Sequence, residues 1–438
     1  MKRVALAIAL LIMVAGVLVS PAMANTTELK VMIFGGGNGS DWVKQAAEEY
    51  AALHPNVTVN VIANPRIEEQ LRPLFISGNP PDVVSPGPNF DIWGAITNGE
   101  MMPLDQALKS PSFDGTGTWR ETFNKALLDI QYQGKTYGIP QIFSTGMVWW
   151  YNAKLFRENG WEVPKTWDDL YKLNTQARAT GRYLFALQGI YPNYYFGGLY
   201  LALVQRIGGT KALEDAFNLV PGAWTSQPFL KAAEETLRMK KAGFFLLGTM
   251  ALNHTDSQTQ FFLGHTLFVM AGTWLEGEMK SVIPKDFELR FLNYPAYPGG
   301  KGDPTAIQTS SGWGGGWYVP AKAKHPELAI DFLKYLTSRK VTRNMMRQRG
   351  LLSTVKGTQD ALVSEASKSV LEAMSQANST YAWTKVNDTY PKFTSSVWNA
   401  YQGLLIGDYT AEEFCKYAES QAEKLRNDDS IVKREFHF

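Results

Sequence analysis

The chain has 438 residues, of which 45% are hydrophobic and 13% aromatic, and it contains a single cysteine, Cys415. This length exceeds what one hydrophobic core supports and predicts two or three domains, and a single cysteine excludes an internal disulfide. The formal net charge is only +2, with no basic block, which argues against nucleic-acid binding and favours a neutral ligand.

The first residues predict a secretory signal peptide. Lys2 and Arg3 precede an apolar run over residues 4–19, and Ala22-Met23-Ala24 forms a small-x-small cleavage site. The run is short for a membrane anchor, so an uncleaved anchor is the weaker alternative. We expect residues 1–24 to be removed by cleavage after Ala24. No cysteine adjoins that site, so a lipobox is absent and we expect a freely diffusing periplasmic protein.

The next segment predicts a parallel α/β sheet. A strand, a glycine loop, a helix and two further strands follow one another at residues 29–34, 35–39, 40–53, 57–62 and 83–84. Strands that alternate with helices favour parallel pairing. In such sheets ligands bind at the carboxyl ends of the strands, so the loops over 35–40 and 85–90 are candidate site segments.

The middle of the chain predicts a hairpin over 133–140, an aromatic strand over 147–151 and a mainly helical segment over 161–279. Within it, Thr166 and Asp169 are spaced as a capping box. Strand-like segments return at 289–293 and 316–319. The C-terminal part predicts a helix over 326–336 and a last helix capped by Thr410 and Glu413. We expect the polar tail after Arg426 to be loosely held.

Four blocks carry a family resemblance. The most specific, around residues 133–170, reads GKTYGIPQIFSTGMVWWYNAKLFRENGWEVPKTWDDLYKL, and the others cover 78–84, 262–274 and 315–336. In sequence, order and spacing they resemble the family 1 extracellular solute-binding proteins. These are the periplasmic sugar-binding components of ABC importers, and they include maltose-binding protein. The resemblance runs from the signal peptide to the C-terminal helix.

The resemblance implies an α/β fold of the two-lobed periplasmic binding protein class (type II), with a hinge and a central ligand cleft. By analogy, the chain crosses between lobes near residues 143–148, 293–300 and 347–354. The implied parts are the first lobe over 25–143 and 296–348, and the second lobe over 144–295 and, mainly, 349–438. It further implies a monomeric, non-enzymatic protein that captures a neutral sugar or oligosaccharide and delivers it to the transmembrane subunits of an ABC permease.

Aromatic side chains are the first candidate site residues, because a pyranose presents apolar C–H faces that a ring can cover. Trp274 follows a predicted strand end at Gly272-Thr273, where the family places a sugar-stacking aromatic; a core role is its alternative. Trp313 lies among glycines and serines. For it, an incidental ring in a hinge is an equal alternative. Trp398 resembles another sugar-facing position, but its spacing to Gly407 departs from the family pattern, so core packing is at least an equal alternative.

Polar side chains that bind sugar hydroxyls are the second set of candidates. They lie on the loops at predicted strand ends and near the predicted crossings: Asn38, Asp41, Asn89, Asp91, Ser144, Gln188, Tyr191 and Ser311. Two have structural alternatives. Support of a helix start is the alternative for Asp41, and capping of a helix is an equal alternative for Asp91.

Two other functions compete with the sugar-binding receptor at this point. A secreted glycoside hydrolase requires two carboxylates roughly 5 to 10 Å apart, and the sequence nominates no such pair. The same receptor fold binding a polyol or a glycerol-phosphate ester requires basic groups in the cleft, which the candidate loops largely lack. No phosphate loop, CxxC, HExxH or GxSxG motif occurs, so we expect neither a metal nor a cofactor.

Overall fold

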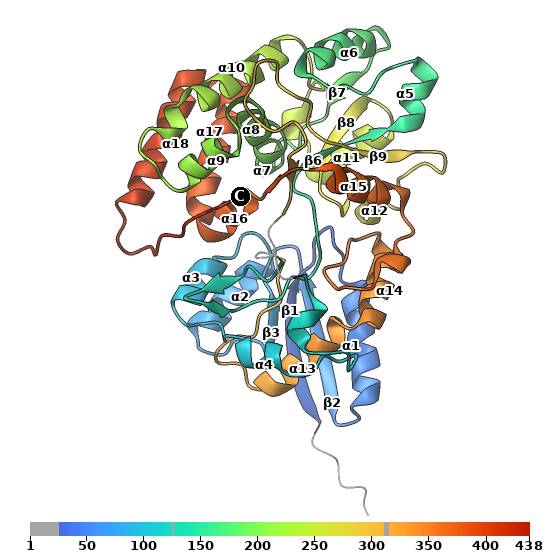
Figure 1. The fold of residues 1–438 in the computed structure, drawn as a ribbon, viewed down its shortest axis with the longest axis vertical. Helices are drawn as coiled ribbons and strands as arrows, with labels where there is room; N and C mark the ends of the chain where they lie inside the picture. Colours follow the sequence, from blue (N-terminus) through green and yellow to red (C-terminus); the bar gives the residue numbers. More distant parts are fainter. Residues whose placement is uncertain (1–25, 125–126, 311–314) are drawn as a thin grey trace, which may run out of the picture.

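The computed structural model describes residues 26–124, 127–310 and 315–438. The predicted signal peptide lies outside these ranges. Figure 1 shows two lobes, one above the other, each with its own sheet and covering helices. Within the described ranges, no helix combines the length and the apolar composition that crossing a bilayer requires.

The first lobe contains a three-stranded parallel sheet in the order β2-β1-β3. Its strands are β1 (Thr27–Phe34), β2 (Val57–Asn64) and β3 (Val83–Ser85). The helices of this lobe are α1 (Asp41–Leu53), α2 (Ile67–Ile76), α3 (Ile92–Thr97), α4 (Asp105–Lys109), α13 (Pro326–Leu336) and α14 (Arg339–Arg349). The sheet and its short helical connections confirm the parallel α/β pattern expected from the alternating apolar runs.

Burial explains the order of the first lobe. Leu29, Val31 and Ile33 alternate along β1 and join one buried cluster with Val43 and Tyr50 of α1. A period of two on the strand and of three to four on the helix brings these faces together. A short hairpin of β4 (Gln131–Tyr132) and β5 (Lys135–Thr136) completes the lobe, as the sequence predicted.

The second lobe is built on a mixed sheet in the order β7-β8-β6-β9. Its strands are β6 (Val148–Asn152), β7 (Tyr183–Phe185), β8 (Thr266–Ala271) and β9 (Leu289–Leu292); β7 runs parallel to β8, and β6 runs antiparallel to β8 and β9. Its helices are α5 (Ala153–Asn159), α6 (Trp167–Ala179), α7 (Asn193–Tyr195), α8 (Ala202–Gly208), α9 (Thr210–Phe217), α10 (Gln227–Lys241), α11 (His254–Phe262), α12 (Leu275–Glu278), α15 (Glu365–Gln376), α16 (Thr384–Thr389), α17 (Pro391–Ile406) and α18 (Ala411–Arg426).

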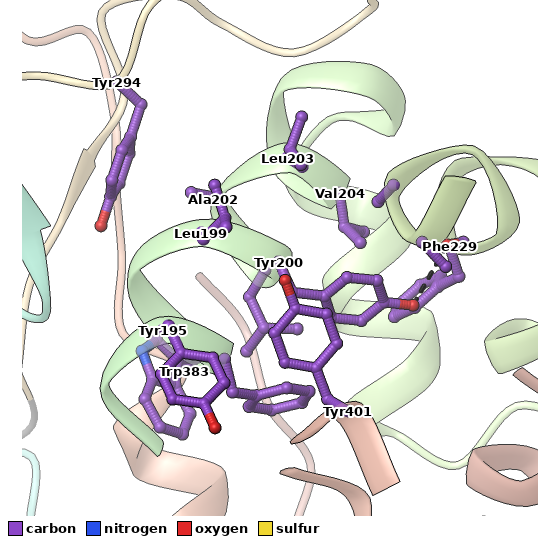
Figure 2. Close-up of a cluster of buried hydrophobic side chains, with 14 of the residues drawn as sticks. Tyr195, Leu199, Tyr200, Ala202, Leu203, Val204, Phe229, Tyr294, Trp383 and Tyr401 are labelled. Carbon is purple, nitrogen blue, oxygen red and sulfur yellow. Dashed lines mark hydrogen bonds between the residues drawn. The ribbon is translucent and has the colours of Figure 1, made fainter. Parts of the chain in front are cut away.

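Aromatic side chains dominate the core of the second lobe. Figure 2 shows Tyr200 and Tyr401 packed together, and their ring centroids lie 4.8 Å apart. The Tyr200 hydroxyl donates to the carbonyl of Phe229 at 3.1 Å, so its polar end is satisfied inside the core. Such bulky rings in the core account for part of the 13% aromatic content.

Helix capping follows the predicted residues in two places. Thr166 and Asp169 form a complete capping box at α6, and Thr410 and Glu413 form another at α18. Ser40, the residue before α1, makes no side-chain capping bond. The three-residue spacing of a capping box is a local property, which is why it is recognisable in the sequence.

In the part of the chain that the structure describes, three segments that link the lobes lie side by side. Phe143 pairs with Leu352, and Thr145 pairs with Thr309. Phe143, Thr145 and Leu352 fall within the ranges in which the first and last crossings are expected. For the middle crossing, Tyr294 and Ala306 both belong to the core of the second lobe, whereas Trp317 belongs to that of the first.

Arg206 of α8 explains why residues 296–306 stay with the second lobe rather than the first. Its side chain is buried, and its guanidinium donates to the carbonyls of Tyr294, Asp303 and Ala306 at 2.9–3.1 Å. A buried guanidinium requires such acceptors. The boundary expected at residue 296 is therefore corrected to a return beyond Thr309.

The C-terminal tail also differs from the prediction. We expected it to be loosely held, but Phe436 is buried. Its backbone exchanges two hydrogen bonds with the Asn218 side chain, at 2.9 and 2.7 Å. An aromatic anchor and paired hydrogen bonds outweigh the polar composition of the tail.

Candidate functional site

The loops after β1 and β8 meet between the lobes. Trp274, the residue before α12, presents its indole to Gly37, and a β-carbon at Gly37 would lie 2.5 Å from Trp274 Cδ1. Only a glycine permits this approach. On the first-lobe side, Arg349 Nη2 donates to the carbonyl of Gly37 at 3.0 Å. Trp274 is partly buried and packs against the core of the first lobe, although it follows strand β8 of the second lobe.

Ser144 links the hinge to this contact. Its hydroxyl donates to the carbonyl of Thr145 at 2.8 Å and accepts from the Thr273 hydroxyl at 3.0 Å. Both residues of the Ser144–Thr273 pair are buried. The pair therefore fixes the backbone next to Trp274, and the donor capacity of Ser144 is used within the protein.

Asn38 and Asp41 follow Gly37 but differ in their surroundings. Asn38 Oδ1 is buried and has no hydrogen-bond partner in the described structure, whereas Asp41 is exposed in the first turn of α1. A buried acceptor without a partner carries a free-energy penalty that a ligand hydroxyl would relieve. A carboxylate at a helix N-terminus is stabilised by the helix dipole without any ligand.

Gln188 and Tyr191 lie on the loop after β7. Gln188 is fully buried and donates from Nε2 to the carbonyl of Met270 at 2.8 Å, while its Oε1 has no partner among the described residues. Tyr191 is 43% exposed and packs edge-on against the ring of His254. This arrangement ties the ends of the parallel strands β7 and β8 together.

An aromatic and acidic cluster continues from Tyr191 towards Trp274. Tyr194 stacks on His254, whose Nε2 lies 3.3 Å from Glu278 Oε1. Burial, with the Glu278 charge as a smaller contribution, raises the pKa of Tyr194 far above its ordinary value. Tyr194 therefore remains a protonated hydrogen-bond donor. The backbone of Glu278 donates to the carbonyl of Trp274, so the short helix α12 connects this cluster to Trp274.

Asn89, Asp91 and Trp398 come together elsewhere, in a groove of about 850 Å³ between α3 and α17. Asp91 caps α3 by accepting from the backbone of Gly94 at 2.8 Å, which is the structural alternative given above. Asn89 Nδ2 lies 3.4 Å from a Glu68 carboxylate oxygen. Trp398 packs partly against the core of the second lobe and partly lines the groove.

The predicted residues within the described ranges thus fall into three groups. Asn38, Asp41 and Ser144 lie on the segments next to the Gly37–Trp274 contact. Gln188 and Tyr191 follow β7 and contact Met270 and His254. Asn89, Asp91 and Trp398 line the α3–α17 groove. Ser311 and Trp313 lie outside the described residues. Arg349 and the pair of His254 and Glu278 are not among the residues predicted from the sequence. Arg349 lies within the expected third crossing, which is the one signal that pointed to it; the other two depend on packing that the sequence does not reveal.

The placement of metal-ligating side chains decides whether a metal centre can form within the part of the chain that the structure describes. Among residues 26–124, 127–310 and 315–438, no group of three or more His, Cys, Asp or Glu side chains is placed to hold a metal ion. The arrangement offers aromatic faces, amide groups and the guanidinium groups of Arg349 and Arg72, which are groups that bind a neutral polyhydroxylated ligand.

Comparison with known proteins identifies the family. A family model described as bacterial extracellular solute-binding protein matches residues 45–374. The diacetylchitobiose binding protein NgcE of Streptomyces coelicolor is 26% identical over 442 residues, covering 94% of this chain and 87% of the relative. The multiple sugar-binding protein of Streptococcus mutans is 24% identical over 73% of each chain.

Solved structures share the fold. A chitin oligosaccharide binding protein superimposes with a TM-score of 0.77 at 19% identity, over 91% of this chain and 99% of the other. The solute-binding protein RafE in complex with raffinose gives 0.74 at 18% identity, over 92% and 100%. The chain therefore has the two-lobed type II periplasmic binding protein fold expected from its sequence.

Proposed function

Because the chain belongs to the bacterial extracellular solute-binding protein family, we propose that it is the substrate-binding protein of an ABC importer, capturing a neutral sugar or oligosaccharide between its lobes. Proteins of this family bind solutes rather than transform them. The observation that carries the proposal is the approach of Trp274 to Gly37. It brings an aromatic face from one lobe to a strand-end loop of the other.

The chemistry of this contact suits a sugar ring. Trp274 supplies an apolar face for the C–H side of a pyranose, and Asn38 supplies an acceptor for a hydroxyl. Arg349 lies beside both and adds a fixed donor array. A ligand that touches groups from both lobes binds best when the lobes are together, and this preference drives closure.

The named relatives suggest the first ligands to test. NgcE is named for diacetylchitobiose, and a structural neighbour is named for chitin oligosaccharides. We therefore place short β-linked N-acetylglucosamine oligosaccharides first in a panel that also contains xylo-oligosaccharides, raffinose, maltose and the parent monosaccharides. A polyol and a glycerol-phosphate ester complete the panel.

The cellular setting belongs to the same proposal. Removal of residues 1–24 leaves 41 basic and 41 acidic residues, because Lys2 and Arg3 are the only charged residues of the leader. A neutral, freely diffusing monomer in the periplasm then delivers its ligand to the transmembrane subunits of the permease. N-terminal sequencing of the exported protein checks cleavage after Ala24, and light scattering checks the monomer.

Titration calorimetry of the purified protein against the panel tests the function. We expect at least one neutral sugar to bind below about millimolar, and Trp274→Ala to weaken that binding about tenfold or more through loss of the stacking face. Trp398→Ala is the matched variant in the α3–α17 groove, and Phe113→Ala, exposed on the first lobe, is the surface control.

Each other outcome contradicts a defined part of the proposal. Absence of any binding below millimolar contradicts the sugar ligand. Loss of binding in Trp398→Ala with full binding in Trp274→Ala moves the ligand to the groove. Turnover of a glycoside by the wild-type protein, measured by release of reducing sugar, contradicts a pure binding function.

A further inference from the structure

The lobes touch through a second set of side chains, on the side of α3 and α16 rather than at Trp274. From the first lobe it includes Pro88, Trp93 and Asp129. The second lobe contributes Lys385 and Asn387 of α16 and residues 432–434 of the tail. We call this set the clasp. None of the crossing segments at Phe143, Thr145, Thr309 and Leu352 passes through it.

The tail in the clasp is anchored firmly in the second lobe. Phe436 is 2% exposed within the aromatic core, and Phe438 packs edge-on against Phe217 of α9. The backbone of Phe438 donates to Glu214 at 2.8 Å. Residues 432–434 are therefore fixed to the second lobe, and any contact that they make with the first lobe links the two lobes.

The first-lobe partner of the tail is Trp93 of α3. Its indole Nε1 donates to the carbonyl of Val432 at 2.8 Å, and the guanidinium of Arg434 lies over its ring, 5.6 Å from the centroid. The backbone of Arg434 donates to the Tyr390 hydroxyl at 2.7 Å, within the second lobe. Trp93 is thus held between a hydrogen bond and a cation, both supplied by the other lobe.

Helix α16 supplies the charged part of the clasp. Lys385 Nζ lies 2.7 Å from Asp129 Oδ2, and these side chains are only 22% and 27% exposed. Asn387 Nδ2 donates to the carbonyl of Pro88 at 3.0 Å. Burial lowers the pKa of Arg434, and the nearby Asp129 and Asp388 carboxylates act against that shift. Asp129 therefore faces two cations from the second lobe.

We propose that the clasp is a conformational device that favours the arrangement with the lobes together, before any ligand binds. A partly dehydrated ion pair and two hydrogen bonds across the lobes are lost when α3 and α16 separate. Their net free energy biases the equilibrium between separated and closed lobes. Trp93, Asn387 and Val432 also line the α3–α17 groove, so the test uses the ligand-free protein and requires no particular ligand.

Pulsed electron–electron double resonance on the ligand-free protein measures how the clasp affects the distance between the lobes. Spin labels at Lys44→Cys on α1 and Lys240→Cys on α10 report the distance between the lobes, because both positions are exposed and lie outside the clasp. Burial raises the pKa of the native Cys415 thiol to about 12, so the native thiol does not compete for the label. The variants are Trp93→Phe, which removes the indole donor, and Asp129→Asn.

We expect the double variant Trp93→Phe/Asp129→Asn to show a longer mean distance between the labels, or a second and longer population. Glu49→Gln is the matched control, since it breaks the 2.6 Å pair with Lys340 inside the first lobe. A thermal unfolding transition in each variant verifies that it is folded. A double variant whose distance distribution equals that of the control, or moves to shorter distances, overturns the proposal.

Discussion

The indole Cδ1 of Trp274 lies 2.5 Å from the position that a β-carbon on Gly37 would occupy. Two strand ends, one from each lobe, approach so closely at this point that only glycine fits. The distance between Trp274 and Gly37 therefore changes directly with the separation of the lobes. The contact also couples the proposed ligand platform, Trp274, to the backbone of the opposite lobe.

A methyl group at this point is expected to hold the lobes apart. In Gly37→Ala, the overlap with Trp274 must be relieved by a shift of the ring or of the lobe, at a cost of about 1–3 kcal/mol. We expect sugar affinity, measured by calorimetry, to fall about tenfold. Gly315→Ala is the control, because the nearest atom to its added carbon is 4.0 Å away. Equal affinity in both variants would show that the contact is irrelevant to binding.

Arg206 is expected to be the most sensitive buried polar residue of the second lobe. It is 1% exposed and satisfies carbonyls of Tyr294, Asp303 and Ala306. Arg206→Met leaves these acceptors unpaired, and we expect a loss of about 3–5 kcal/mol in the free energy of unfolding.

Denaturant titration of Arg206→Met provides the measurement. Arg206→Lys is expected to restore little, because an ammonium group cannot reproduce the planar fork. The exposed Arg178, whose guanidinium lies over Tyr183, provides the control, and Arg178→Met is expected to lose less than about 1 kcal/mol. An Arg206→Met protein as stable as the wild type would contradict the stabilising role that we assign to these hydrogen bonds.

The capping box of α6 predicts an acid-dependent contribution to stability. Hydrogen bonds from Thr166 lower the pKa of Asp169 to about 2. Because the folded pKa lies below the ordinary value of 3.8, the ionised form stabilises the fold above that value, and the contribution disappears as the pH falls towards 2.

The difference in unfolding free energy between wild type and Asp169→Asn is therefore expected to be constant near neutrality and to shrink between about pH 4 and pH 2. Urea titrations across this range measure it. Asp168→Asn, in the same helical turn but outside the capping box, is the comparison. A difference for Asp169→Asn that does not change with pH would refute the assignment.

Cys415 is expected to be chemically silent in the folded protein. Burial raises the pKa of its thiol to about 12, so almost no thiolate exists at neutral pH. A thiol-specific chromogenic reagent should react with the native protein far more slowly than with the protein in guanidinium chloride. Lys240→Cys is the positive control, and rapid labelling of native wild type would contradict the burial of Cys415.

The sequence alone determined the local elements and the family. Periodic apolar residues predicted β1, α1 and β2, and the spacing of Thr166 with Asp169 predicted a capping box that the structure contains. These features depend on contacts within a few residues along the chain. The ordered family blocks added the two-lobed fold, which the comparisons confirm.

The tertiary structure decided which predicted side chains meet. Asp91 and Trp274 both follow strand ends, yet Asp91 caps α3 beside the groove and Trp274 lies on Gly37. The lobe boundary also moved from residue 296 to beyond Thr309, because Arg206 holds carbonyls that are distant in sequence. The cap at Asp91 is local, but the Trp274 contact and the lobe boundary depend on contacts between residues 88 or more positions apart and on the angle between the lobes. No local pattern in the sequence encodes either one.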